Sequence, residues 1–140
     1  MSGTLAHPET TAHELRTTLG RIVRRLRASG DLPMTQEMVL SRLDREGAQT
    51  TSTLAAGAGV RPQSMAQTVA DLERATFVTR RADPADRRQV LIELTSAGRA
   101  ALEAERRSRE GWLAQAIAER LDADEQATLH RAVQLLGRLA

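Results

Sequence analysis

The hydrophobic and polar positions of the chain follow two different periods. Between residues 13 and 74 the apolar positions recur about every 3.6 residues, which is typical of helices with one buried face. The pattern predicts a first helix over residues 13–28, a second from Thr35 to Gly47, a short third after residue 53 and a fourth over residues 61–74. Residues 1–10 lack such a pattern and are expected to form a loose tail.

Several residues mark where these helices begin and end. We expect Thr35 to cap the second helix and Gly47 to end it, and a hydroxyl of residues 50–53 to cap the third. Pro62 suits the first turn of the fourth helix because its missing N–H group is not needed there. Arg61, directly before it, is a poor N-cap.

After residue 76 the apolar period shortens to two. Residues 77–81 are rich in β-prone side chains, and residues 89–94 alternate between apolar and polar, so we expect a β-hairpin with residues 83–88 as its turn. Thr95 then caps a long helix that ends near residue 121, and a final helix follows. The predicted order is α-α-α-α-β-β-α-α, a mainly α fold with a small β-hairpin wing.

Length and composition narrow the classes of protein. The 140 residues suit one compact protomer. The absence of cysteine excludes a disulfide framework, a zinc finger and a thiol nucleophile. No apolar run approaches the roughly 18 residues of a membrane span, and the N-terminus has no signal-peptide pattern. We therefore expect a cytoplasmic protein without a membrane partner.

The charge of the chain does not by itself indicate nucleic-acid binding. The net charge is only +2, and all twenty basic residues are arginine, so the high isoelectric point reflects missing titratable groups. Any binding of nucleic acid must depend on where the arginines lie. Phe77 and Trp112 are the only aromatic residues, which argues against modules that stack single-stranded bases.

A helix-turn-helix pattern covers residues 52–74. Ala55 is small enough for two helices to cross closely, Gly59 permits a left-handed turn between them, and Met65 packs the second helix on the first. An ordinary helical hairpin has similar spacings.

The hairpin that follows completes a winged-helix pattern. Its tip holds Arg87 and Arg88 beside Asp83 and Asp86. Arginine suits a narrow DNA minor groove, whose negative potential attracts a weakly hydrated guanidinium. We expect one arginine to enter the groove and the other to pair with Asp83 or Asp86, which would structure the tip. A solvated surface turn has a similar composition.

The terminal helices carry apolar stripes that a winged helix does not need for its own core. Packing them together and against a second copy satisfies these stripes and presents two recognition helices to half-sites about 34 Å apart. Packing within a monomer is the alternative. We expect a tail and dimerisation helix over residues 1–32, a DNA-binding part over residues 33–94 and dimerisation helices over residues 95–140.

From about Leu15 to Leu139, the chain resembles the MarR family of bacterial transcriptional regulators. The matching stretches are residues 32–36, 54–60, 72–74 and, most specifically, 83–88 through 94–98. The resemblance implies a homodimeric winged helix-turn-helix protein that binds pseudo-palindromic duplex DNA, usually as a repressor. Many such proteins release DNA when a small aromatic or anionic molecule enters a crevice between the dimerisation and DNA-binding parts.

By position, the resemblance places five residues on the exposed face of the recognition helix: Arg61, Gln63, Ser64, Gln67 and Thr68. Glutamine and arginine can make bidentate contacts with adenine and guanine edges. Two positions depart from the family: Thr76 stands where glycine is usual, and Arg61 stands where Ser or Thr is common. Neither departure removes a predicted contact residue.

The sequence contains weaker signals for a metal, catalytic or ligand-binding site. Three scattered histidines without cysteine predict no metal site, and no catalytic motif or cofactor-binding motif is present, so an enzyme is not expected. Met34, Met38 and Trp112 are candidates for a ligand crevice, although core packing is the commoner role of such residues. A protein-interaction module and a nonspecific architectural DNA-binding protein remain the rival functions.

Overall fold

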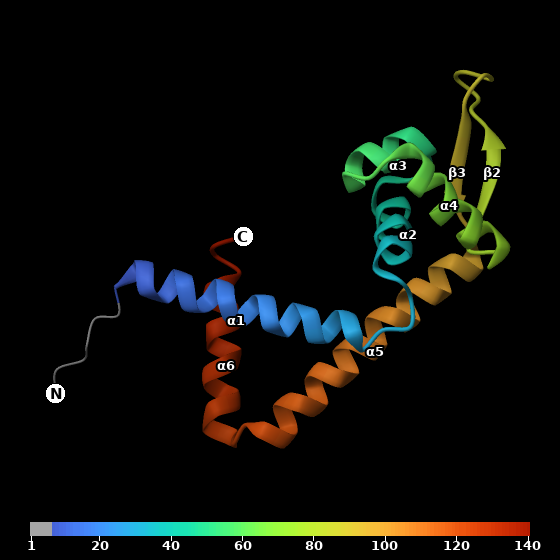
Figure 1. Cartoon of the computed structure of the whole chain (residues 1–140). Coiled ribbons are helices and arrows are strands. Elements are labelled where there is room, and N and C mark those ends of the chain that lie inside the picture. Colours follow the sequence, from blue (N-terminus) through green and yellow to red (C-terminus); the bar gives the residue numbers. More distant parts are fainter. Residues whose placement is uncertain (1–6) are drawn as a thin grey trace, which may run out of the picture. The chain divides into compact units, whose positions relative to one another are not determined.

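The computed structural model describes residues 7–140 (Figure 1). The elements are α1 (Pro8–Ala28), α2 (Met34–Glu46), β1 (Gln49–Thr50), α3 (Thr51–Ala58), α4 (Pro62–Arg74), β2 (Val78–Ala82), β3 (Val90–Leu94), α5 (Ser96–Arg120) and α6 (Ala123–Leu136). The chain forms two compact units. Among the described residues, one unit, the helical unit, comprises residues 7–29 and 108–140, and the other, the winged unit, comprises residues 30–107.

The predicted fold class is confirmed, with one added strand. Gly47 ends α2, Thr50 caps α3 by accepting a hydrogen bond from the Thr53 N–H group, and Pro62 begins α4. The two-residue strand β1 was not predicted because so short a segment has no periodic pattern. No helix within residues 7–140 is long and apolar enough to cross a membrane.

Two predicted helix starts are wrong. Residues 8–10 belong to α1 rather than to a tail, because Pro8 suits a first turn and Glu9 interacts favourably with the helix dipole. The rest of the predicted tail, residues 1–6, lies outside the described residues. Thr35 does not cap α2: the helix begins at Met34, and its N-cap Pro33 offers no side-chain hydrogen bond.

The winged unit surrounds one hydrophobic core. Its buried apolar side chains come from α2, α3, α4, β2, β3 and α5: Val39, Leu40, Leu43, Leu54, Ala55, Met65, Val69, Leu72, Val78, Ile92 and Leu102. Gly59 adopts a left-handed conformation with φ of 65° between α3 and α4, and Ala55 and Met65 are buried. The sequence reasoning on the helix-turn-helix is therefore confirmed.

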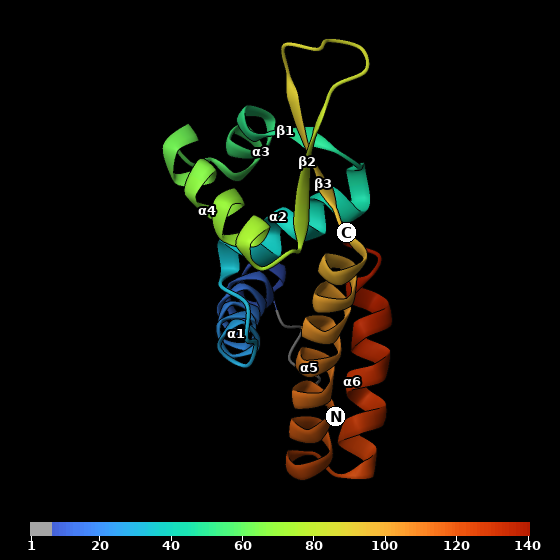
Figure 2. The same ribbon diagram turned by 90° about the vertical axis from the view of Figure 1, so that its right-hand side faces the viewer.

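A three-stranded antiparallel sheet completes this unit. The order is β1-β3-β2, so β3 is the central strand. Arg80 pairs with Ile92 and Val78 with Leu94 across the hairpin. Figure 2 shows the turn of this hairpin extending beyond α3 and α4, so the wing tip stands clear of the helices of its own unit.

A tight junction joins the end of α4, the first wing strand and the start of α5. The Thr95 hydroxyl donates to the Thr76 carbonyl at 2.6 Å and accepts the Gly98 N–H at 3.0 Å. Thr76 has φ of 64°, a left-handed conformation that β-branched residues rarely adopt. A Cβ atom at Gly98 would lie 2.1 Å from the Phe77 carbonyl oxygen, so the backbones approach as closely as glycine allows.

This close approach predicts opposite effects for two glycines of α5. Gly98→Ala places a methyl group against backbone that cannot move freely, and overpacking of this kind destabilises by about 2 kcal/mol. Gly111→Ala adds a methyl group where no atom lies within 4 Å, and its better helix propensity should stabilise by about 1 kcal/mol. Urea unfolding followed by circular dichroism measures both; a stable Gly98→Ala protein would contradict the junction.

Candidate nucleic-acid interface

Helix α4 has one face in the core and the other in solvent. Met65, Val69 and Leu72 are buried at helical spacing. On the opposite side, Arg61, Gln63, Ser64 and Gln67 are exposed, and Thr68 is half-buried. The helix begins without a side-chain cap, as expected for Arg61 at the N-cap. The uncapped N–H groups and the positive end of the helix dipole therefore favour a negatively charged partner at this end.

The free hydrogen-bonding capacity of α4 is concentrated in its first turn. Gln67 Nε2 already donates to Asp71 Oδ1 at 3.0 Å, and the Thr68 hydroxyl donates to the Ser64 carbonyl at 3.1 Å. Arg61 and Gln63 make no side-chain hydrogen bond or ion pair to any described residue. These two side chains and the exposed Ser64 hydroxyl are consequently the groups most available to an external partner.

Two aspartates organise the backbone of the wing tip. Asp83 Oδ1 accepts the Ala85 N–H at 2.9 Å, and Asp86 Oδ1 accepts the Arg88 N–H at 3.1 Å. Main-chain hydrogen bonds between residues 83, 86 and 89 close the turn. Short polar side chains often hold turns in this way. The tip therefore has a defined backbone conformation.

The two wing arginines differ in their contacts. Arg88 Nε donates to Asp86 Oδ1 at 3.2 Å, while its side chain remains 92% exposed. Both terminal nitrogens of Arg88 thus stay available. Arg87 is exposed and has no side-chain partner within residues 7–140. One carboxylate therefore orients one of the two arginines.

Two ion pairs at the base of the wing were missed in the sequence reasoning. Arg80 Nε lies 2.8 Å from Glu73 Oε2 and joins β2 to α4, while Arg81 Nε lies 2.8 Å from Glu93 Oε2 on the neighbouring strand. Hairpin register, which pairs Arg81 with Leu91 and Thr79 with Glu93, puts Arg81 diagonal to Glu93. That register was a usable signal for the second pair.

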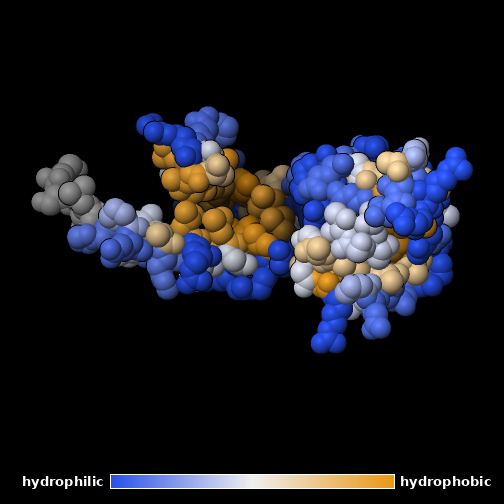
Figure 3. Space-filling model, turned by 90° about the horizontal axis from the view of Figure 1, so that it is seen from above, coloured by the Kyte–Doolittle hydropathy of each residue, from blue (hydrophilic) through white to orange (hydrophobic). Residues whose placement is uncertain are grey.

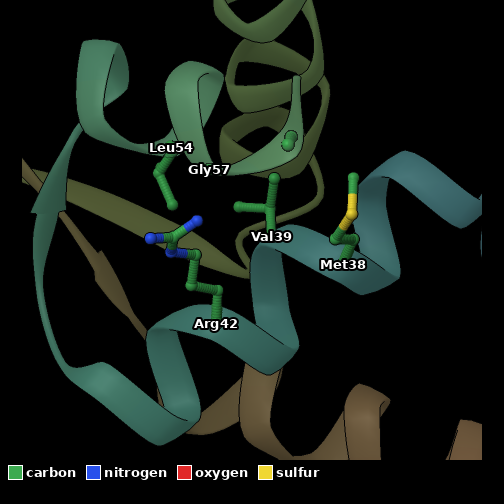
Figure 4. A pocket seen from close by; sticks show the side chains of 6 residues that line it. Met38, Val39, Arg42, Leu54 and Gly57 are labelled. Carbon is green, nitrogen blue, oxygen red and sulfur yellow. The ribbon is translucent and has the colours of Figure 1, made fainter. Parts of the chain in front are cut away.

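The predicted crevice residues occupy separate surroundings within their units. Met34 and Met38 are exposed on α2. Met38 borders a small pocket of about 20 Å³, in which the Arg42 side chain lies beneath α3 at Gly57 (Figure 4). A pocket of this size holds about one water molecule, so it is too small for an effector.

The Arg42 guanidinium is held beside Glu46. Gln49 Nε2 donates to Glu46 Oε2 at 2.6 Å, and Arg42 Nε donates to the same oxygen at 3.0 Å. The hydrogen bond from Gln49 and the nearby arginines lower the pKa of Glu46 below its ordinary value. A charged Glu46 therefore keeps Arg42 in its position under α3.

The helical unit presents an apolar groove. Its volume is about 660 Å³, and its lining comes from α1, α5 and α6: Thr18, Leu19, Arg21, Ile22, Arg25, Trp112, Leu113, Ala116, Ile117, Arg120, Leu121, Leu129, Val133 and Leu136. No residue of α1 or α6 is buried, and Val133 is 56% exposed. Figure 3 shows the apolar surface in orange over these helices. The protomer thus leaves this face uncovered.

Comparisons with known proteins agree on one family. The sequence profile of the MarR family matches residues 32–90. An HTH-type transcriptional regulator of Mycobacterium bovis is 36% identical over 128 residues, 89% of this chain and 89% of that protein. The crystal structure of a transcriptional regulator from Pseudomonas aeruginosa has 34% identity and a TM-score of 0.75, covering 92% of this chain and 91% of the other.

A third comparison shows the same fold at lower identity. BpsR of Bordetella bronchiseptica, whose DNA binding is regulated by 6-hydroxynicotinic acid, is 24% identical with a TM-score of 0.58, covering 96% of this chain and 98% of the other. The relatives that share more than 30% identity are transcriptional regulators rather than enzymes. With its helix-turn-helix, its wing and these relatives, the chain belongs to the MarR family of transcriptional regulators.

Proposed function

We propose that this regulator is a homodimeric repressor that recognises a pseudo-palindromic operator in duplex DNA. One observation carries the proposal: a single unit combines an uncapped, exposed first turn of α4 with a structured wing tip that presents arginine. A helix for the major groove and an arginine for the minor groove are complementary to neighbouring features of one duplex.

In the major groove, the first turn of α4 would supply the base contacts. The N-terminal residues of a recognition helix are those that reach base edges. Gln63 would read adenine through its amide, and Arg61 would contact guanine or a phosphate. Gln67 and Thr68 would contribute after exchanging their intrahelical hydrogen bonds for contacts with DNA, whereas the Ser64 hydroxyl would contribute directly.

In the minor groove, Arg88 would be the arginine that enters, although the sequence analysis gave that role to the arginine that does not pair with an aspartate. Its Nε is held by Asp86, so less conformational freedom is lost on binding, and its terminal nitrogens remain available for base or sugar oxygens. Arg87 would contact the phosphate backbone. Asp83 and Asp86 would act by holding the tip in shape.

The apolar groove of the helical unit would be filled by a second copy of the chain. Exposed leucine, isoleucine and valine side chains on α1 and α6 form a contiguous apolar patch rather than single scattered positions. Patches of this kind mark interfaces. A two-fold dimer would cover the same surface on both copies and present two α4 helices to two half-sites.

A small anionic molecule with an aromatic ring would release the DNA. Trp112 borders a separate hollow of about 390 Å³ together with Arg25, Ala28 and Ser29. An indole and a guanidinium together suit an aromatic carboxylate. The ligand of BpsR has this chemistry. Because Trp112 is the only tryptophan, its fluorescence reports binding at this hollow.

Binding to DNA tests the main proposal. Fluorescence anisotropy with the DNA upstream of the chain's own gene, and with a scrambled duplex, should show preference for the former and an affinity that falls steeply with salt. Gln63→Ala should lower the ratio of specific to nonspecific affinity by about tenfold or more, since a bidentate base contact contributes about 1–3 kcal/mol. Gln134→Ala, an exposed glutamine on α6, should leave the ratio unchanged.

The same assay separates the rival functions. Equal affinity for both duplexes, with Gln63→Ala weakening neither selectively, would favour an architectural DNA-binding protein. No binding at low salt would favour a protein-interaction module. Either result would contradict sequence-specific recognition.

The wing assignment predicts that Asp86 acts through Arg88. Asp86→Asn removes a negative charge, which by itself should strengthen binding to DNA, so a loss of about tenfold would show that orientation of Arg88 matters. In the double variant with Arg88→Ala, Asp86→Asn should cause no further loss. If the losses caused by Asp86→Asn and Arg88→Ala add in the double variant, Asp86 does not act through Arg88. Arg87→Ala is the control, and its loss should add to that of Asp86→Asn.

The dimer assignment predicts a solution mass of twice 15.3 kDa by light scattering. Val133→Glu should weaken dimerisation roughly 100-fold, because a carboxylate would become buried without a partner. Gln134→Glu, on the same helix but outside the groove lining, is the matched control. A monomer at micromolar concentration, or equal effects of both variants, would be inconsistent with this interface.

A further inference from the structure

A buried carboxylate on α5 binds the backbone of the segment between α1 and α2. Glu105 is 4% exposed, the only buried charged residue within residues 7–140. Its Oε2 atom accepts the N–H groups of Asp31 at 3.0 Å and of Leu32 at 3.3 Å. Hydrogen bonds to a charged acceptor are stronger than neutral ones, and a buried carboxylate is costly unless it is satisfied in this way.

The position of this contact along the chain is informative. The chain passes between the two units at two places, after Ser29 and after Arg107. The second passage lies inside α5, which is a continuous helix from Ser96 to Arg120. The first lies in the short connection between α1 and α2. Glu105, Asp31 and Leu32 all belong to the winged unit and lie within two residues of a passage.

The connection is held on both sides of its passage. On the side of the helical unit, the Ser29 N–H donates to Arg25 and Leu26 carbonyls, its hydroxyl donates to Leu26, and it thereby closes α1. On the side of the winged unit, Glu105 holds Asp31 and Leu32, and the Leu32 side chain packs against the core. Only Gly30 remains between the two held segments.

From this we infer that Glu105 is a positioning residue, whose carboxylate restricts the connection at residues 30–32 and so limits the orientations that the winged unit can take on the helical unit. A helix resists bending, whereas an unrestrained connection of five residues permits many conformations. Removing the carboxylate would free the backbone of Asp31 and leave one continuous helix as the main restraint.

The consequence for DNA depends on the proposed function. In a dimer bound to two half-sites, a limited range of orientations for each winged unit limits the distance between half-sites at which both α4 helices can bind. Changing the spacer by two base pairs displaces a half-site by about 7 Å and rotates it by about 70°. Glu105 would therefore make the regulator selective for half-site spacing, in addition to the base sequence that α4 reads.

The absence of cysteine permits a direct test by electron paramagnetic resonance. Spin labels at Ala66→Cys on α4 and Ala127→Cys on α6, both exposed, report the distance between the units. With an excess of unlabelled protein, a dimer contains at most one labelled protomer, so only distances within one protomer are measured. We expect Glu105→Ala to broaden the distance distribution about twofold, as local restraint is lost. Glu103→Ala, an exposed acid on the same helix, should not broaden it.

Two further variants separate positioning from folding. Glu105→Gln keeps an oxygen that can accept both N–H groups and should retain a narrow distribution. Glu105→Met keeps the buried volume but no comparable acceptor, so it should fold and broaden the distribution even if Glu105→Ala does not fold. Unchanged widths in Glu105→Met, or equal broadening in Glu103→Ala, would overturn the assignment.

A second measurement addresses DNA. With a duplex selected by the wild-type protein from a random library, the wild-type protein should lose affinity when the spacer changes by two base pairs, and Glu105→Met should reduce that loss about tenfold. Parallel losses would refute the role in spacing. If the wild-type protein selects no sequence, the proposed function fails, while the distance measurement still decides whether Glu105 restricts the connection.

Discussion

The contact between Gly98 and the Phe77 carbonyl is the constraint on which the DNA-binding surface depends. It brings the first turn of α5 against the residue that leads from α4 into the wing. The Thr95 hydroxyl completes the contact by bridging the Thr76 carbonyl and the Gly98 N–H. Because the recognition helix ends and the wing begins at this junction, its geometry determines how these two elements of one unit are placed. Thr76 retains a strained conformation here because hydrogen bonds on both sides hold it.

The helices differ in how their N-termini are capped. Helix α6 begins with a complete capping box between Asp122 and Glu125, and Thr50 caps α3. Helix α4, by contrast, begins with Arg61 and no side-chain cap. A missing cap typically costs about 1 kcal/mol, and it leaves N–H groups that a phosphate can satisfy. Helices α1 and α2 also begin without a side-chain cap, so the missing cap marks the start of α4 as available to a partner only together with the exposed side chains around it.

The two units differ in how much of their apolar surface they bury within themselves. The winged unit has a closed core to which six of its elements contribute buried apolar side chains, and the wing is tied to its base by ion pairs. The exposed ion pairs add little free energy individually, so their contribution is to hold register and orientation. In the helical unit, α1 and α6 bury no residue, and an apolar groove remains open. Glu105 lies in the winged unit, two residues before the chain passes into the helical unit.

Sequence alone was sufficient for the helices, the hairpin and the family, because periodicity, glycine placement and the residues of the wing are local properties. Gly59 and Pro62 mark their turns through backbone preferences that need no tertiary information. The resemblance to the family also indicated the exposed face of α4, apart from Thr68, which is half-buried. The sequence did not indicate the start of α2, which lies at Met34 directly after Pro33, nor the strand β1, which exists only through pairing with β3. The tertiary structure decided two further points. The fold of the wing tip brings Asp86, rather than Asp83, within reach of Arg88. Glu105 accepts backbone hydrogen bonds only because a segment 74 residues earlier in the chain lies against it.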